Sequence, residues 1–416
     1  MKLSALQQYG VVTANYWAFT LTDGALRMLV VFHFHELGYS TLEIASLFLF
    51  YEFFGVITNL YGGWIAARYG LRLTLWLGTL LQIAALLMLI PVASSWPKLA
   101  SVIYVMAAQA ISGIAKDLNK MSAKSAIKTV VQGLPETTNE AEHQLFRWVA
   151  ILTGSKNALK GVGFFLGGLL LTALGFNQTV AWMAGGLAAA FLVTLVLPSH
   201  IGKMKAKPGF SSLFSKSQAI NMLSLARFFL FGARDIWFVV ALPVFLEVSF
   251  GWDFWKIGGF LGLWVIGYGC VQGLAPAIRR LWGKSTNPGP STVQFWSALL
   301  TAIPGLIAVA LWREVDASIA VIAGLAAFGV VFAMNSSIHS YMVLAYTDQD
   351  NVSLNVGFYY MANAAGRLLG TLLSGSIFML GRNATAGLQV CLVTSSLLVL
   401  LSWFSSLRLP SVSKRL

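Results

Sequence analysis

An all-α integral membrane protein with twelve transmembrane helices, arranged as two pseudo-symmetric halves of six, is the fold expected from this sequence. Hydrophobic residues make up 57% of its 416 residues and charged residues only 10%, compared with about 25% charged residues in soluble proteins. Long apolar segments recur along the chain, and short sequence repeats relate its two halves. A soluble fold could not cover so much apolar surface with so few charges. The composition therefore excludes soluble enzymes, disordered chains and collagen-like chains.

Twelve segments meet the requirement of about 20 mostly apolar residues for a membrane-spanning helix. The first six lie near residues 9–33, 41–66, 73–92, 100–119, 148–174 and 179–197. The second six lie near residues 220–248, 254–276, 293–312, 317–346, 352–381 and 388–407. No small-residue cleavage site follows the first segment, so we expect a retained span rather than a removed signal peptide.

The distribution of Lys and Arg between the spans predicts the orientation of the chain. If the N-terminus is cytoplasmic, the loops on that side hold most of the basic residues outside the spans. This distribution follows the positive-inside rule, and it explains most of the net charge of +13 without a nucleic-acid partner. We therefore expect a multi-pass protein of the cell inner (plasma) membrane, with the lipid bilayer as its surroundings and both termini in the cytoplasm.

Sequence repeats suggest that the two halves arose by duplication. Residues 38–44 (GYSTLEI), after the first span, resemble residues 251–257 (GWDFWKI), after the seventh. The pair Asn157-Ala158 in the fifth span recurs as Asn363-Ala364 in the eleventh at a similar offset. We expect six-helix halves at residues 1–198 and 218–416, joined by a basic cytoplasmic linker at 199–217. In transporters built from such parallel repeats, substrate binds near the midplane between the halves.

Polar and cationic side chains within the spans are the candidates for a substrate site, because charges in a membrane are costly and usually functional. The candidates are Arg27, Lys116, Asn119, Lys120, Lys124, Lys156, Asn157, Lys160, Arg234 and Arg367. Spacings of four residues place the three lysines of the fourth span on one helix face, and likewise the two lysines of the fifth span. The cations outnumber the carboxylates in these spans, and unpaired buried cations would be strongly penalised. We therefore expect a small anionic substrate, held by bidentate Arg and point-charge Lys donors.

Two structural explanations compete with this interpretation. The pairs Asp23–Arg27, Asp117–Lys120 and Arg234–Asp235 could be salt bridges that hold helices together, which would leave Lys156, Lys160 and Arg367 unpaired. Lys124 and Lys128 could instead belong to a solvated cytoplasmic extension of the fourth helix.

Proton coupling would require a carboxylate or a histidine in a low-dielectric environment. The candidates are Asp23, Glu52, Asp235 and His339.

No metal site, cofactor or enzymatic activity is expected. Cys270 and Cys391 lie far apart in apolar segments, and no catalytic triad or zinc spacing is present. The segment 283–286 (GKST) resembles part of a phosphate-binding loop, but Ile278 replaces the first glycine that such a loop requires.

Two segments resemble signatures of the major facilitator superfamily. Residues 63–72 (GWIAARYGLR), between the second and third spans, resemble its loop signature, although Ala67 and Leu71 replace an expected acid and an expected base. This resemblance implies a gating role for Gly63, Arg68, Gly70 and Arg72. Residues 163–168 (GFFLGG) resemble the end of the antiporter signature, with Phe164 in place of its proline.

Three further segments resemble the ArsJ-type organoarsenical efflux transporters: residues 15–27 (NYWAFTLTDGALR), 112–124 (SGIAKDLNKMSAK) and 152–161 (LTGSKNALKG). The resemblance implies export of 1-arseno-3-phosphoglycerate and hence arsenate resistance. It also implies a functional link to glyceraldehyde-3-phosphate dehydrogenase, which makes this compound when arsenate replaces phosphate. The cation-rich spans would equally serve an organophosphate transporter. A non-transporting membrane sensor is the alternative from another functional class.

Overall fold

The computed structural model describes residues 3–39, 43, 47–92, 95–131, 138–198, 201, 209–214, 217–282, 288–348 and 351–411, and these form an all-helical bundle. The helices of the first half are α1 (Ala5–Glu36), α3 (Leu49–Tyr69), α4 (Leu71–Met88), α5 (Lys98–Val131), α6 (Thr138–Leu174) and α7 (Phe176–Val193). Those of the second half are α8 (Gln218–Phe238), α9 (Ala241–Phe250), α10 (Phe254–Leu281), α11 (Pro290–Trp312), α12 (Ala317–Ala345), α13 (Val352–Phe378) and α14 (Ala384–Ser406). Because α8 and α9 together form one interrupted span, the prediction of twelve spans is confirmed.

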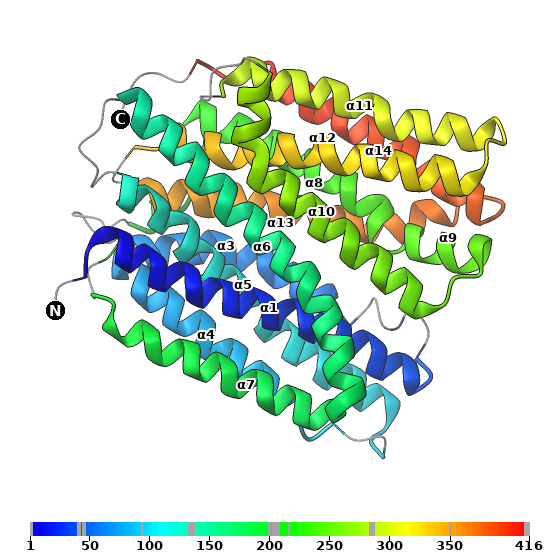
Figure 1. Cartoon of the computed structure of the whole chain (residues 1–416), viewed down its shortest axis with the longest axis horizontal. Helices are drawn as coiled ribbons and strands as arrows, with labels where there is room; N and C mark the ends of the chain where they lie inside the picture. The colour runs from blue at the N-terminus through cyan, green and yellow to red at the C-terminus, as the bar shows by residue number, and fades with distance from the viewer. Residues whose placement is uncertain are drawn as a thin grey trace.

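The long helices run side by side, and both termini lie at the same end of the bundle (Figure 1). We call this end, where α1 begins at Ala5 and α14 ends at Ser406, the terminal end; the opposite end is the distal end. At the distal end, Gly38 follows α1 and Gly251 follows α9, both with left-handed φ angles of 80° and 62°. The two segments that resemble each other in sequence therefore both begin with a glycine in the left-handed region.

Two helices extend beyond the predicted spans at the terminal end. Helix α5 continues to Val131 and α6 begins at Thr138, whereas the apolar segments were expected at 100–119 and 148–174. Hydropathy marks only the part of a helix that lipid or protein surrounds, and the Ala-, Lys- and Glu-containing segments beyond it still favour helix. The side chain of Lys128 and most of the predicted linker at 199–217 lie outside the described residues.

Among the described residues, nine helical segments are long and apolar enough to cross a membrane. Helices α1, α3 and α13 are not among these nine, although each has the length of a span. These three helices carry Asp23, Glu52 and Arg367 within their length. Their lower apolarity follows from side chains that face the interior of the bundle rather than lipid.

Glycines allow the two halves to approach closely at the terminal end. A Cβ atom at Gly63 of α3 would lie 3.0 Å from the Cα atom of Gly357 of α13. Small residues at such crossings let membrane helices pack backbone to backbone. Nearby, the rings of Phe146 in α6 and Tyr341 in α12 lie 5.3 Å apart. These contacts hold the two halves together at the terminal end.

Replacing Gly63 with alanine is expected to lower the free energy of unfolding by about 1–3 kcal/mol, the usual cost of overpacking a close contact. The reason is that the added methyl group would meet the backbone of Ser353 and Gly357, which belongs to a continuous helix. Thermal unfolding of the purified protein in detergent measures the effect. Gly185→Ala in α7 is the matched control, since no atom lies within 4 Å of a Cβ at Gly185. Equal stability of the two variants would contradict this packing argument.

Candidate functional site

A cavity of about 270 Å³ lies between the two halves and is lined by residues from α1, α3, α5 and α6 on one side and α8, α9, α10, α12 and α13 on the other. Its lining extends from Lys124 in α5 and Ser336 in α12 to Phe48, which precedes α3, and Pro243 in the first turn of α9. The two halves contact each other on both sides of this cavity, at Gly63 and Gly357 toward the terminal end and at Phe32 and Trp255 toward the distal end. Its size is near the lower limit for small-molecule sites, which is about 300 Å³.

Cationic side chains dominate the lining of this cavity. The cations that line it are Arg27, Lys116, Lys120, Lys124, Lys156, Lys160, Arg227, Arg234 and Arg367. Glu52 and Asp235 are the two carboxylates among its lining residues. Two further carboxylates, Asp23 and Asp117, are buried behind this lining. A group of cations this dense favours a ligand that carries several negative charges.

Carboxylates of the first half pair with the lysines of α5 and α6. Lys160 Nζ lies 2.8 Å from Asp23 Oδ2, and the hydroxyl of Tyr51 donates to Asp23 Oδ1 at 2.5 Å. Lys120 Nζ lies 2.5 Å from Asp117 Oδ1, so this pair of the salt-bridge alternative forms, but both residues belong to α5 and the pair joins no two helices. The expected pair Asp23–Arg27 was wrong. A spacing of four residues places two side chains on one helix face, but here a lysine of the neighbouring helix lies closer.

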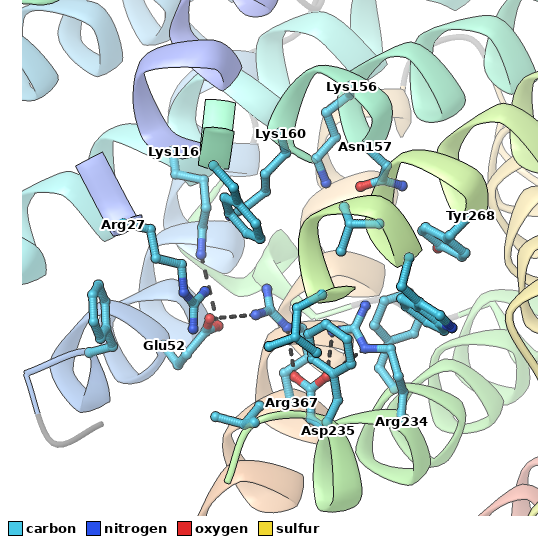
Figure 2. A pocket seen from close by; sticks show the side chains of 18 of the residues that line it. Arg27, Glu52, Lys116, Lys156, Asn157, Lys160, Arg234, Asp235, Tyr268 and Arg367 are labelled. Atoms are coloured by element: carbon cyan, nitrogen blue, oxygen red, sulfur yellow. Dashed lines mark hydrogen bonds and ion pairs between the residues drawn. The ribbon is translucent and has the colours of Figure 1, made fainter. Parts of the chain in front are cut away.

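An ionic network joins the two halves across the cavity (Figure 2). Arg367 of α13 lies 2.5 Å from Glu52 Oε1 of α3, and its Nε lies 3.0 Å from Asp235 Oδ2 of α8. Arg234 Nε in turn donates to Asp235 Oδ1 at 2.6 Å. Lys116 Nζ lies 3.8 Å from Glu52 Oε2. The expectation that ion pairing would leave Lys160 and Arg367 unpaired was therefore wrong for both residues.

Four cavity cations have no carboxylate within ion-pairing distance in the described part of the chain: Arg27, Lys124, Lys156 and Arg227. The guanidinium of Arg27 lies over the ring of Phe48, 4.9 Å from its centroid. Lys124 donates to the hydroxyl of Thr153. Figure 2 shows Lys156 extending into the cavity with no ion pair or hydrogen bond drawn to it.

Arg227 is the cavity cation that the sequence-based candidates omit. It is 3% exposed. Its Nε donates to Asn363 Oδ1 at 2.9 Å and its Nη1 to Ser336 Oγ at 3.0 Å. Arg227, Phe231 and Arg234 recur at helical spacing, so Arg227 shares a helix face with a residue that was selected. That spacing could have identified Arg227.

The amide of Asn157 joins the cavity wall to the second half. Its Nδ2 donates to Gln272 Oε1 of α10. Gln272 Nε2 donates to the hydroxyl of Tyr268 at 2.8 Å and to Ser336 Oγ at 3.1 Å. Asn363, which repeats Asn157 in the second half, accepts from Arg227. Both repeated asparagines therefore lie in the wall of the cavity.

Asn119 and His339 do not line the cavity, which corrects their expected position. Asn119 Oδ1 accepts from Asn15 Nδ2 at 3.1 Å and from Thr79 Oγ1 at 3.3 Å, so it links α5 to α1 and α4. His339 is 0% exposed within α12, and neither of its ring nitrogens has a hydrogen-bond partner among the described residues. Polar residues in spans can serve contacts between helices as well as sites, and sequence alone does not separate these uses.

The segment 63–72 lies at the terminal end. Gly63 forms the close crossing with α13, and Gly70 makes the turn between α3 and α4 with a φ angle of 98°. The guanidinium of Arg68 lies 5.2 Å from the Trp64 ring centroid, and that of Arg72 lies 4.0 Å from the Trp76 ring centroid. The gating role of these residues stays a prediction.

Within the described ranges, no three His, Cys, Asp or Glu side chains come together as metal ligands.

Comparisons with known proteins extend the description of the fold. The sequence profile of the Major Facilitator Superfamily matches residues 12–371. A bacterial homologue of the iron transporter ferroportin in an outward-facing state has a TM-score of 0.71 at 13% identity, over 96% of this chain and 99% of that one. The human organic anion transporter MFSD10 has a TM-score of 0.68 at 17% identity, over 97% and 100%. The proton:xylose symporter XylE has a TM-score of 0.71 at 13% identity, over 99% and 97%. At these sequence identities, the similarity to the three solved structures shows the fold alone. No curated protein matches the sequence.

Proposed function

The chain belongs to the major facilitator superfamily and is a secondary transporter, not an enzyme, and we propose that it exports an anionic organoarsenical, 1-arseno-3-phosphoglycerate, from the cytoplasm. Export would proceed by alternating access of the cavity to the two sides of the membrane. The result would be resistance to arsenate in a cell whose glyceraldehyde-3-phosphate dehydrogenase makes this compound.

The observation that carries the proposal is the charge of the cavity. Nine cations line it, and four of them, Arg27, Lys124, Lys156 and Arg227, have no carboxylate within ion-pairing distance among the described residues. An anionic ligand would compensate these four cations whenever the cavity excludes water. The proposed substrate carries a phosphate at one end and an arsenate group at the other. A cavity of about 270 Å³ suits a molecule of this size rather than a large ligand. The resemblance of three segments to organoarsenical exporters supports the choice among polyanions.

We propose that the lysines of α5, Lys116, Lys120 and Lys124, attract the substrate when the terminal end is open. Lys156, Lys160, Arg234 and Arg367 would then hold it near the midplane, with Arg27 contacting it toward the distal end.

Coupling to protons is proposed at Asp23 or Asp235. Each carboxylate is paired with a cation that lines the cavity, Lys160 for Asp23 and Arg367 for Asp235. Protonation of either carboxylate would release its cation to the substrate, and loss of the proton would draw the cation back. The protonation state of either carboxylate would therefore control how strongly its cation attracts the anion, which would couple proton binding to substrate binding.

Everted inner-membrane vesicles test the proposed function. Vesicles that contain the protein should accumulate arsenic when supplied with arsenate, glyceraldehyde-3-phosphate dehydrogenase, its aldehyde substrate and its nicotinamide cofactor. Vesicles without the protein, and reactions without the dehydrogenase, are the controls. Arsenic accumulation that does not depend on the dehydrogenase would overturn the choice of substrate. Uptake of a labelled organophosphate in exchange for phosphate would support the organophosphate alternative, and the absence of any transport would favour a sensor.

A further inference from the structure

We propose that Lys124, Lys156 and Arg227 form a phosphoryl-binding subsite within the cavity. The three residues come from α5, α6 and α8, and therefore from both halves of the bundle. All three line the cavity. The inference rests on the proposed function, because it assumes that the substrate is an organic anion that carries a phosphoryl group.

The first argument is that carboxylates divide the cavity into two regions. In one region, Lys160 is paired with Asp23, and Lys120 is paired with Asp117. Arg367 of the same region is paired with both Glu52 and Asp235. In the other region, Lys124, Lys156 and Arg227 have no carboxylate within ion-pairing distance among the described residues. All of these groups are cations. The region around Lys124, Lys156 and Arg227 is therefore where a bound anion would relieve the most repulsion.

The second argument is the supply of hydrogen-bond donors. Arg227 uses its Nε and Nη1 atoms to bond Asn363 and Ser336, which fixes its guanidinium while Nη2 has no acceptor within the described residues. Lys124 donates to Thr153 and has ammonium protons to spare. Lys156 has no acceptor in that part of the chain. These cations can together surround the three terminal oxygens of a phosphoryl group.

The third argument distinguishes a phosphoryl group from a carboxylate. A phosphate monoester carries a charge of about −1.5 to −2 at neutral pH and three acceptor oxygens. A carboxylate carries a single charge and two oxygens. Three cations without a carboxylate partner fit the first group better, and the other end of the substrate would lie toward Arg27.

Binding of three small anions to the purified protein in lipid nanodiscs tests the subsite. The anions are glycerol 3-phosphate, glycerate and 3-phosphoglycerate, and calorimetry measures their affinity. Lys156→Met should lower the affinity for both phosphate esters by about tenfold, because one charge-assisted hydrogen bond is lost. It should leave the affinity for glycerate unchanged. Arg227→Lys, which keeps the charge but not the planar donor geometry, should show the same selectivity. Arg27→Met is the matched control. It removes another unpaired cavity cation and should weaken glycerate at least as much as glycerol 3-phosphate.

The outcomes separate the subsite from the proposed function. The subsite would be overturned if Lys156→Met lowered the affinity for all three anions equally. It would also be overturned if only Arg27→Met lowered the affinity for the phosphate esters selectively. Phosphate-selective loss in Lys156→Met without arsenic accumulation in the vesicles would support the subsite and overturn the choice of substrate. Failure of the wild-type protein to bind either phosphate ester would overturn the subsite, whereas the vesicle assay alone would decide the proposed function.

Discussion

Replacing Arg367 with methionine is expected to abolish transport and to lower the free energy of unfolding by about 3–5 kcal/mol, the usual cost of removing one partner from a buried ion pair. Arg367 is the cation that joins Glu52 of the first half to Asp235 of the second. Without it, Glu52 would keep only Lys116, at 3.8 Å. Denaturant unfolding in detergent measures the stability, and uptake by everted vesicles measures transport.

The double variant Arg367→Met/Glu52→Gln is the matched control for this prediction. It removes the uncompensated carboxylate together with its partner and leaves the pair of Arg234 and Asp235 in place. We expect it to regain most of the lost stability but not the transport, because the substrate would still lack the guanidinium. Unchanged stability of Arg367→Met would show that the bridge between the halves contributes little to the folded state.

Replacing Lys160 with methionine should likewise stop arsenic accumulation in the vesicles. Lys160 lines the cavity and neutralises Asp23, which would then keep only the hydrogen bond from Tyr51. Because an unpaired buried carboxylate also destabilises the fold, the amount of folded protein is measured beside transport, by size-exclusion chromatography in detergent.

The double variant Lys160→Met/Asp23→Asn separates substrate binding from charge balance. It should recover the amount of folded protein without recovering transport. Transport that returns in this double variant would mean that Lys160 serves only to neutralise Asp23, and would remove it from the proposed substrate site. The single variant Asp23→Asn completes the set. If Asp23 carries the coupling proton, its transport should no longer respond to an imposed pH gradient.

Much of the fold could be predicted from the sequence, because long apolar segments must lie in the hydrocarbon of the bilayer. The number of spans and the location of most cavity cations follow from hydropathy and from helical spacing. The partners of those cations do not. Lys160 pairs with Asp23, 137 residues away, and Arg367 pairs with Glu52, 315 residues away. Periodicity shows which residues share one helix face, but the rotation of each helix against its neighbours depends on packing.

The same limit explains the individual errors. Asn119 was selected because it lies among the lysines of α5, yet it points toward α1 and α4, where Asn15 and Thr79 donate to it. Helical spacing relative to Arg234 could have identified Arg227, but nothing in its local sequence shows that Asn363 and Ser336 receive its donors. These side chains are separated from Arg227 by more than 100 residues in the chain. Their proximity exists only in the folded bundle.

The low apolarity of α1, α3 and α13 has a consequence for how the protein enters the membrane. A charged residue at the centre of a helix opposes insertion by about 2.5–3.5 kcal/mol, and these three helices carry Asp23, Glu52 and Arg367. Among the described helices of sufficient length, they are the ones whose apolarity falls short of that of a membrane-spanning segment. They gain their counter-charges from other helices, Asp23 from α6 and Glu52 from α13. Stable insertion of α1 and α3 in the bilayer therefore depends on α6 and α13, which the ribosome makes later. The residues that form the ionic network thus also stabilise the inserted helices.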